Sequence, residues 1–111
     1  MLELDHLPFS VVDVDPACAL FRRIGFEPSA TGVCRWSQHG QAYSERCAST
    51  VFESGYLDLI EVRDGAWERR LRASPLHHQG LAPSGVVLGT PSLDAARARL
   101  AASGIAVGEA Y

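Results

Sequence analysis

Residues 15–26 read DPACALFRRIGF, and residues 94–105, which lie 79 positions later, read DAARARLAASGI. Both segments begin with aspartate, carry apolar residues at helical spacing and end with glycine followed by a large apolar residue. A glycine at that place is typical of a helix that ends in a left-handed turn. We expect Asp15 to be the N-cap of the first helix and Pro16 to occupy its first position. The sequence therefore predicts the same helix twice, and a repeat predicts architecture more directly than a single motif does.

The repeat extends to the segment before each helix. The same offset places Phe9 on Leu88, so residues 85–90 are predicted to repeat a strand over residues 4–12. Successive side chains of a strand point to opposite faces. One face of this first strand should meet the helix, and it carries Leu7, Phe9 and Val11. The other face carries Leu4, His6, Pro8 and Ser10.

Between the two repeats the sequence predicts three more strands and a short helix. The strands are expected over residues 32–37, 42–53 and 56–63, separated by glycine-containing turns. A helix over residues 66–73 and a connecting loop over residues 74–84 follow. One face of the last of these strands carries Tyr56, Asp58, Ile60 and Val62. The predicted order is strand–helix–strand–strand–strand, followed by the start of the same unit.

Length and composition limit the class of protein. A chain of 111 residues that is 47% hydrophobic has room for one domain with a real core. A formal net charge of −3 gives no general reason to bind nucleic acid or an anionic membrane. No apolar run approaches a membrane span, and no basic leader precedes an apolar run near the amino terminus. The three cysteines are odd in number and lack metal-type spacing, so we expect reduced thiols and a cytoplasmic protein.

Three segments resemble the glyoxalase-like domain of the vicinal-oxygen-chelate superfamily. They are LDHLPFSVVDVDPACALFRRIGFEP (residues 4–28), GYLDLIEVRD (55–64) and GVVLGTPSLDAARARLAASGIAVGE (85–109). The resemblance implies an α+β fold of βαβββ modules, each with a mixed curved sheet that helps to enclose a cavity. It divides one domain, residues 1–111, into a first module (1–65), a helix and connecting loop (66–83) and the start of a second, incomplete module (84–111).

The resemblance also implies a metal site. Metal-dependent members of the superfamily place a histidine in the first strand and a carboxylate in the last strand of each module. Carried over by position, these ligands fall on His6 and Asp58, with a divalent metal ion as the implied cofactor. The repeat places Gly85 where the second module would have its histidine, and Asp58 is shorter than the usual glutamate. Two ligands are fewer than the four to six that such ions take.

His6 and Asp58 have other interpretations. Without a metal, the Asp58 carboxylate could orient the His6 imidazole as a general base that removes a proton beside a carbonyl group. His6 could also be a cavity-lining residue bound to backbone. A carboxylate within an apolar strand must be paired, hydrated or coordinated, so Asp58 either faces a polar cavity or forms an ion pair with Arg35 or Arg46.

The expected partner is a small-molecule ligand held in a cavity, with Trp36, His39 and Tyr56 as substrate-binding candidates. Ordinary roles compete for two of them, since Trp36 could be core and His39 an exposed turn residue. Three functional hypotheses follow: a metal-assisted lyase, isomerase or dioxygenase; a metal-free binding or sequestering module lined by Trp36, Tyr56 and His6; or a structural subunit. The substrate does not follow from the sequence.

The second module lacks most of its sheet, which leaves the apolar face of its helix without a partner. Three explanations are open. The sequence is a fragment of a longer protein, which we favour; or a partner chain supplies the sheet, which predicts a homodimer; or the domain is naturally short.

Overall fold

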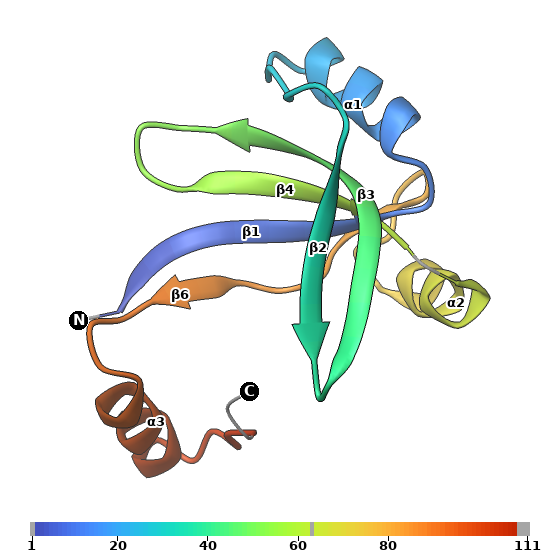
Figure 1. Ribbon diagram of the computed structural model, residues 1–111. Coiled ribbons are helices and arrows are strands. Elements are labelled where there is room, and N and C mark those ends of the chain that lie inside the picture. The colour runs from blue at the N-terminus through green and yellow to red at the C-terminus, as the bar shows by residue number, and fades with distance from the viewer. Residues whose placement is uncertain (1, 63, 109–111) are drawn as a thin grey trace.

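The computed structural model describes residues 2–62 and 64–108. Its elements follow in the order β1 (Glu3–Val11), α1 (Val14–Arg23), β2 (Gly32–Gln38), β3 (Gln41–Val51), β4 (Tyr56–Glu61), α2 (Gly65–Ala73), β5 (Leu81–Pro83), β6 (Val87–Gly89) and α3 (Leu93–Ala102). The strands form one sheet in the order β2-β3-β4-β1-β5, and β6 also pairs with β1. β1 and β4 are parallel, and the other pairs are antiparallel. Figure 1 shows a curved sheet in which β2 and β3 turn across β1. The predicted α+β class with a mixed curved sheet is confirmed.

The core lies between α1 and one face of the sheet. Its buried side chains come from β1, α1, β3 and β4 and are Val11, Val14, Ala17, Cys18, Phe21, Ala48 and Leu59. Phe9 contacts Phe21 edge to face, with 5.8 Å between ring centroids. The predicted helix-facing side of β1 is therefore confirmed, and the opposite face, with His6 and Pro8, is left for other contacts.

The start of α1 differs from the prediction. The N-cap is Asp13, whose carboxylate accepts the backbone N–H of Asp15 at 3.0 Å. The helix begins at Val14, and Pro16 lies at its third position instead of its first. Val14 is fully buried, so the earlier start of the helix places an apolar side chain in the core. The displaced Asp15 instead binds Arg46 of β3, at 2.9 Å.

The repeat is confirmed at the level of hydrogen bonds. α1 covers residues 14–23 and α3 covers residues 93–102, which is the predicted offset of 79. After α1, the N–H of Gly25 donates to the Arg22 carbonyl, and after α3 the N–H of Gly104 donates to the Ala101 carbonyl. Both glycines are left-handed, with φ of 101° and 77°. The two helices therefore end in the same way.

The predicted loop over residues 74–84 contains a short strand. β5 pairs with the end of β1, where Ser10 lies opposite Ala82 and Val11 opposite Leu81. Pro83 closes this strand, a position that an edge strand tolerates because its N–H side need not pair. β5 therefore shares the end of β1 that lies next to α1.

Candidate functional site

The sheet face turned away from α1 carries an aromatic and imidazole pair near the start of β1. His6 lies opposite Tyr56 of β4, and their rings stack with centroids 4.4 Å apart. Desolvation raises the pKa of the Tyr56 phenol above its usual 10.0, and the carboxylates of Asp58 and Asp5 raise it further. The phenol is therefore a hydrogen-bond donor at neutral pH.

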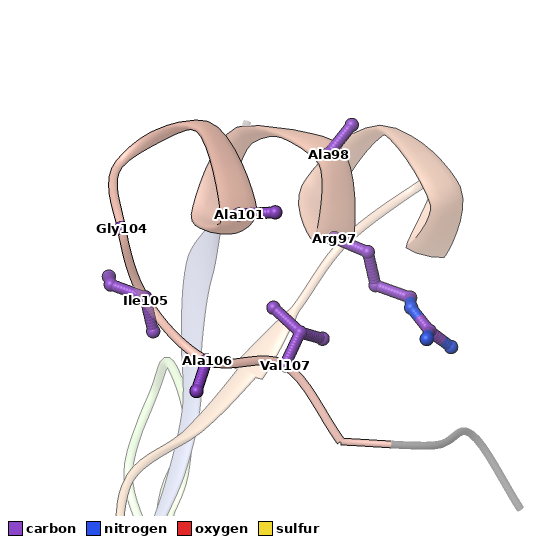
Figure 2. A pocket seen from close by; sticks show the side chains of 7 residues that line it. All are labelled: Arg97, Ala98, Ala101, Gly104, Ile105, Ala106 and Val107. Carbon is purple, nitrogen blue, oxygen red and sulfur yellow. The ribbon is translucent and has the colours of Figure 1, made fainter.

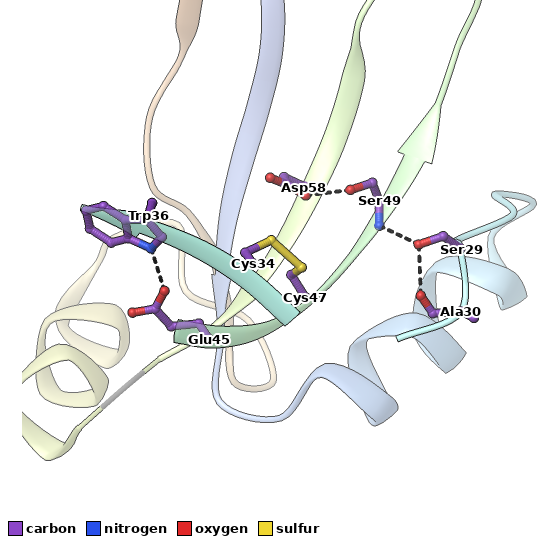
Figure 3. The surroundings of a disulfide bond; sticks show 8 residues. All are labelled: Ser29, Ala30, Cys34, Trp36, Glu45, Cys47, Ser49 and Asp58. Carbon is purple, nitrogen blue, oxygen red and sulfur yellow. Dashed lines mark hydrogen bonds between the residues drawn. A yellow bond between two sulfur atoms is a disulfide. The ribbon is translucent and has the colours of Figure 1, made fainter. Parts of the chain in front are cut away.

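The hydrogen-bond partner of His6 is not the residue that the sequence suggested. The His6 Nδ1 lies 2.6 Å from an Asp5 carboxylate oxygen. Asp58 instead accepts the Ser49 hydroxyl at 2.7 Å (Figure 3). The hypothesis that Asp58 orients the imidazole is therefore wrong in this structure, because Asp5 takes that place.

Within the described residues, Asp58 also lacks the ion pair that was one of its two alternatives. Arg46 lies on the α1 side of the sheet and binds Asp15 and Glu61, with contacts of 2.9 and 3.1 Å. Since Arg46 and Asp58 occupy alternate positions on paired strands, the sheet separates them. Asp58 is half-buried and satisfied by a hydroxyl.

The described residues do not assemble a metal site. His6 and Asp58 share a face, two residue pairs apart along β1 and β4. Within residues 2–62 and 64–108, however, no three His, Cys, Asp or Glu side chains come close enough to hold an ion. Gly85 lies near Pro8, where a Cβ would have an ordinary contact at 4.0 Å. The two implied ligands are thus present without the remainder of a coordination sphere.

A groove lies on the same face, between the sheet and α2. Its volume is about 390 Å³. The lining residues come from β1, β2, β3, β4, α2 and the segments that join them, and are Pro8, Ser10, Trp36, Glu45, Ile60, Glu61, Val62, Trp67 and Ser84. Pro8 and Ser10 lie on the same face of β1 as His6, two and four residues further along the strand. His6 therefore lies beside the groove, toward the start of β1.

A buried carboxylate is part of the groove lining. Glu45 is only 7% exposed, and its carboxylate accepts the indole N–H of Trp36 at 2.5 Å (Figure 3). The Trp36 ring in turn stacks on Tyr43, with centroids 4.3 Å apart. A charged side chain is rarely this buried without a partner, so the Trp36 indole fixes Glu45 in a defined orientation.

A disulfide closes the hairpin that carries this pair. Cys34 of β2 and Cys47 of β3 are bonded, with their Cα atoms 6.0 Å apart. The expectation of three reduced thiols is therefore wrong for these two residues, and only Cys18 is free. The cysteines therefore give no support for a cytoplasmic location. Alternation around the predicted turn would have put both cysteines on one face of neighbouring strands, which was the available signal.

The three predicted substrate-binding residues fall in different places. Trp36 lines the groove. Tyr56 stacks on His6 outside the groove, and His39 lies in the left-handed turn between β2 and β3, with φ of 51°. The sequence did not identify Glu45 and Trp67 as site residues, because no hydrophobic pattern or motif showed that β3 and α2 would line the same groove.

A second hollow lies along α3 and has a different character. Its volume is about 620 Å³, and its lining is Arg97, Ala98, Ala101, Gly104, Ile105, Ala106 and Val107 (Figure 2). Among these lining residues, Arg97 alone has a polar side chain. The hollow offers apolar surface but no acid–base pair, so we place the candidate site at the groove.

No helix in the described part of the chain is long and apolar enough to cross a membrane.

Comparison with known proteins identifies the family. The model of the glyoxalase-like domain matches residues 4–110. No curated protein matches the chain. Among solved structures, a methylmalonyl-CoA epimerase in complex with methylmalonyl-CoA and NH4+ is similar, with 23% identity and a TM-score of 0.56, over 94% of this chain and 71% of that one.

Two further epimerase structures show the same fold. The methylmalonyl-CoA epimerase from Mycobacterium tuberculosis is 19% identical with a TM-score of 0.58, over 91% of this chain and 63% of that one. A variant of the Streptomyces coelicolor enzyme in complex with 2-nitronate-propionyl-CoA is 23% identical with a TM-score of 0.52, over 91% and 71%. The chain belongs to the glyoxalase-like domain family of the vicinal-oxygen-chelate superfamily.

Proposed function

We propose that this chain binds a small organic molecule in the groove between the sheet and α2. One observation carries the proposal. The two tryptophans of the chain, Trp36 of β2 and Trp67 of α2, line the same groove as the buried carboxylate of Glu45. They are far apart in sequence, so only the fold brings them together.

The lining has the composition of a ligand site. Such sites are mostly apolar, hold a few well-placed polar groups and usually have volumes of roughly 300–1,000 Å³. The groove, at about 390 Å³, combines indole rings and aliphatic side chains with the hydroxyls of Ser10 and Ser84. Both tryptophan residues remain more than one-third exposed, so a flat apolar ligand would cover surface that is now open to water.

The catalytic form of this proposal is acid–base chemistry on the bound molecule. Glu45 lies in the groove, and His6 lies next to the groove on the same face of β1. The similar epimerase structures contain CoA esters, which makes an acyl-CoA the first compound to test for binding and isomerisation. Binding without turnover would support the metal-free binding module instead.

Metal-assisted chemistry is the second candidate, and the shared face of His6 and Asp58 favours it. Such a site would need ligands from water, the bound molecule or another chain. Elemental analysis of the purified protein tests it, with His6→Ala and Asp58→Ala as controls. Stoichiometric metal that both variants lose would support the metal site, and metal-free protein that still binds its compound would contradict it.

Intrinsic fluorescence tests the main proposal directly, because both fluorophores line the groove. A set of small metabolites that includes methylmalonyl-CoA and free CoA is titrated into the protein while tryptophan emission is recorded. We expect a saturable change in emission. Trp36→Phe and Trp67→Phe should each remove part of its amplitude. Glu45→Gln should weaken binding about 10-fold or more, as the loss of a charged hydrogen bond does.

The matched control is Glu68→Gln, which removes a half-buried acid of α2 that pairs with Arg72 outside the groove lining. This variant should bind like the original protein. The proposal is wrong if no compound changes the emission. It is also wrong if a compound binds to Glu45→Gln and to the tryptophan variants as tightly as it binds to the original protein.

A further inference from the structure

The contact between Asp5 and His6 lies at an irregular point of the backbone. Neighbouring residues of a regular strand point to opposite faces, yet the Asp5 carboxylate lies 2.6 Å from the His6 Nδ1. The register with β6 shifts at this point: Leu4 lies opposite Leu88 and His6 lies opposite Val87. Two steps along β1 thus match one step along β6, which makes Asp5 the extra residue of a β-bulge.

The turn between β3 and β4 packs against the backbone of the bulge. Gly55 has a left-handed φ of 84°, and a Cβ at that position would lie 2.7 Å from the Asp5 carbonyl oxygen. Such a contact is closer than two non-bonded atoms tolerate, so only glycine lets the turn approach Asp5. The irregular backbone at Asp5 is therefore supported by packing from a second element.

The hydrogen bond fixes the proton on the imidazole. An ionised carboxylate only accepts hydrogen bonds, so the proton of this contact lies on the His6 Nδ1. In the neutral ring the other nitrogen, Nε2, then carries a lone pair. Stacking on Tyr56 holds the plane of the ring, and within the described residues no hydrogen bond engages Nε2.

We propose that Asp5 is a positioning residue, placed by a β-bulge, which holds His6 as the Nδ1–H tautomer and so presents Nε2 as a hydrogen-bond acceptor to a ligand that extends from the groove toward the start of β1. The ligand it selects carries a donor, such as a hydroxyl, amide or protonated acid, at the end nearest the start of β1. The tautomer is a property of the free protein. Only the contact with the ligand rests on the proposed function.

Nitrogen NMR of the neutral histidine rings tests the tautomer without any ligand. Two-bond proton–nitrogen correlations distinguish Nδ1–H from Nε2–H, and His6→Gln assigns the signal among the four histidines of the chain. We expect the Nδ1–H pattern for His6, its loss in Asp5→Ala, and no change in Glu3→Ala, which removes another exposed acid of β1. An Nε2–H pattern in the original protein overturns the proposal even if Asp5→Ala does not fold.

Binding separates this inference from the proposed function. For a compound found by fluorescence, Asp5→Ala should weaken binding several-fold, while Glu3→Ala should leave it unchanged. If Asp5→Ala alters the His6 tautomer but binds the compound as tightly as the original protein does, Nε2 does not contact the ligand. That result would overturn the proposed contact between His6 and the ligand. If no compound binds at all, the proposed function fails while the tautomer is still decided by NMR.

Discussion

The helices α1 and α3 have the same length and the same ends, yet only α1 is part of a core. α1 buries Val14, Ala17, Cys18 and Phe21. α3 buries Ala96 alone, and Leu93 at its start is 56% exposed. Figure 1 shows α1 against the sheet and α3 beyond the end of β6, away from it. Local sequence thus suffices to define a helix and its caps, whereas burial depends on the strands that the rest of the chain supplies.

The difference follows from what each helix faces. α1 precedes β2, β3 and β4, which return beneath it. α3 follows a strand of three residues, and no further strand follows it within residues 103–108. We propose that residues 84–111 begin a second module whose sheet comes from outside these residues, and that a second copy of the chain is one source of it.

Alanine substitutions at equivalent apolar positions should show the largest difference between α1 and α3. Phe21 and Leu100 occupy equivalent positions, but Phe21 is 5% exposed and lies in the core. Phe21→Ala should lower the free energy of unfolding by about 3–5 kcal/mol, and Leu100→Ala by about 1 kcal/mol or less. Urea denaturation measures both. Equal losses would mean that α3 is packed as tightly as α1.

The disulfide is the next largest difference between the two halves. Cys34 and Cys47 are 13 positions apart, and closing a loop of that size stabilises by about 2–3 kcal/mol. The double variant Cys34→Ser with Cys47→Ser should lose that amount. Melting of the original protein with and without a reductant should show the same loss, and the reductant should have no effect on the double variant. A melting temperature that reductant leaves unchanged would contradict the crosslink.

The two C-terminal glycines allow a matched comparison. Gly25 and Gly104 both have left-handed φ, and an added side-chain carbon would meet no other atom within 4 Å at either position. Alanine therefore costs about 1–2 kcal/mol of backbone strain at each site. Gly25→Ala should lower global stability because α1 is part of the core. Gly104→Ala should only speed hydrogen exchange within α3. A global loss from both would show that α3 unfolds together with the core.

The smallest effect concerns pH. A hydrogen bond from Arg46, with its positive charge, holds the pKa of Asp15 below the usual 3.8. A carboxyl group whose folded pKa is lowered stabilises the fold above its unfolded pKa and loses that effect as pH falls through the folded value. Carboxyl NMR should show Asp15 titrating below 3.8, and Arg46→Gln should return it toward 3.8. An unchanged titration in that variant would contradict the ion pair.

Much of the fold followed from periodicity. The strands of the first module, the helix at residues 65–73 and the C-terminal end of α3 agree with the sequence prediction, because alternation, helical spacing and terminal glycines are local signals. The start of α1 was misjudged since two aspartates compete there, and burial of Val14 decided in favour of Asp13.

The candidate site was less predictable for a physical reason. Trp36 was identified, but Glu45 and Trp67 became site residues only through the curvature that brings β3 and α2 to one groove. Likewise, no alternation rule places Asp5 beside His6, because a bulge breaks the rule. Long-range packing and backbone irregularity are the two kinds of information that a single sequence does not show.

Hydrogen exchange with and without a bound compound tests whether the ligand site is the groove between the sheet and α2, because it reports on the groove and on α3 in one measurement. Binding in the groove should slow exchange in segments that contain Trp36, Glu45 and Trp67 and leave residues 93–107 unchanged. Slower exchange in residues 93–107, with no change in the groove segments, would place the ligand in the hollow along α3 and contradict a ligand site in the groove.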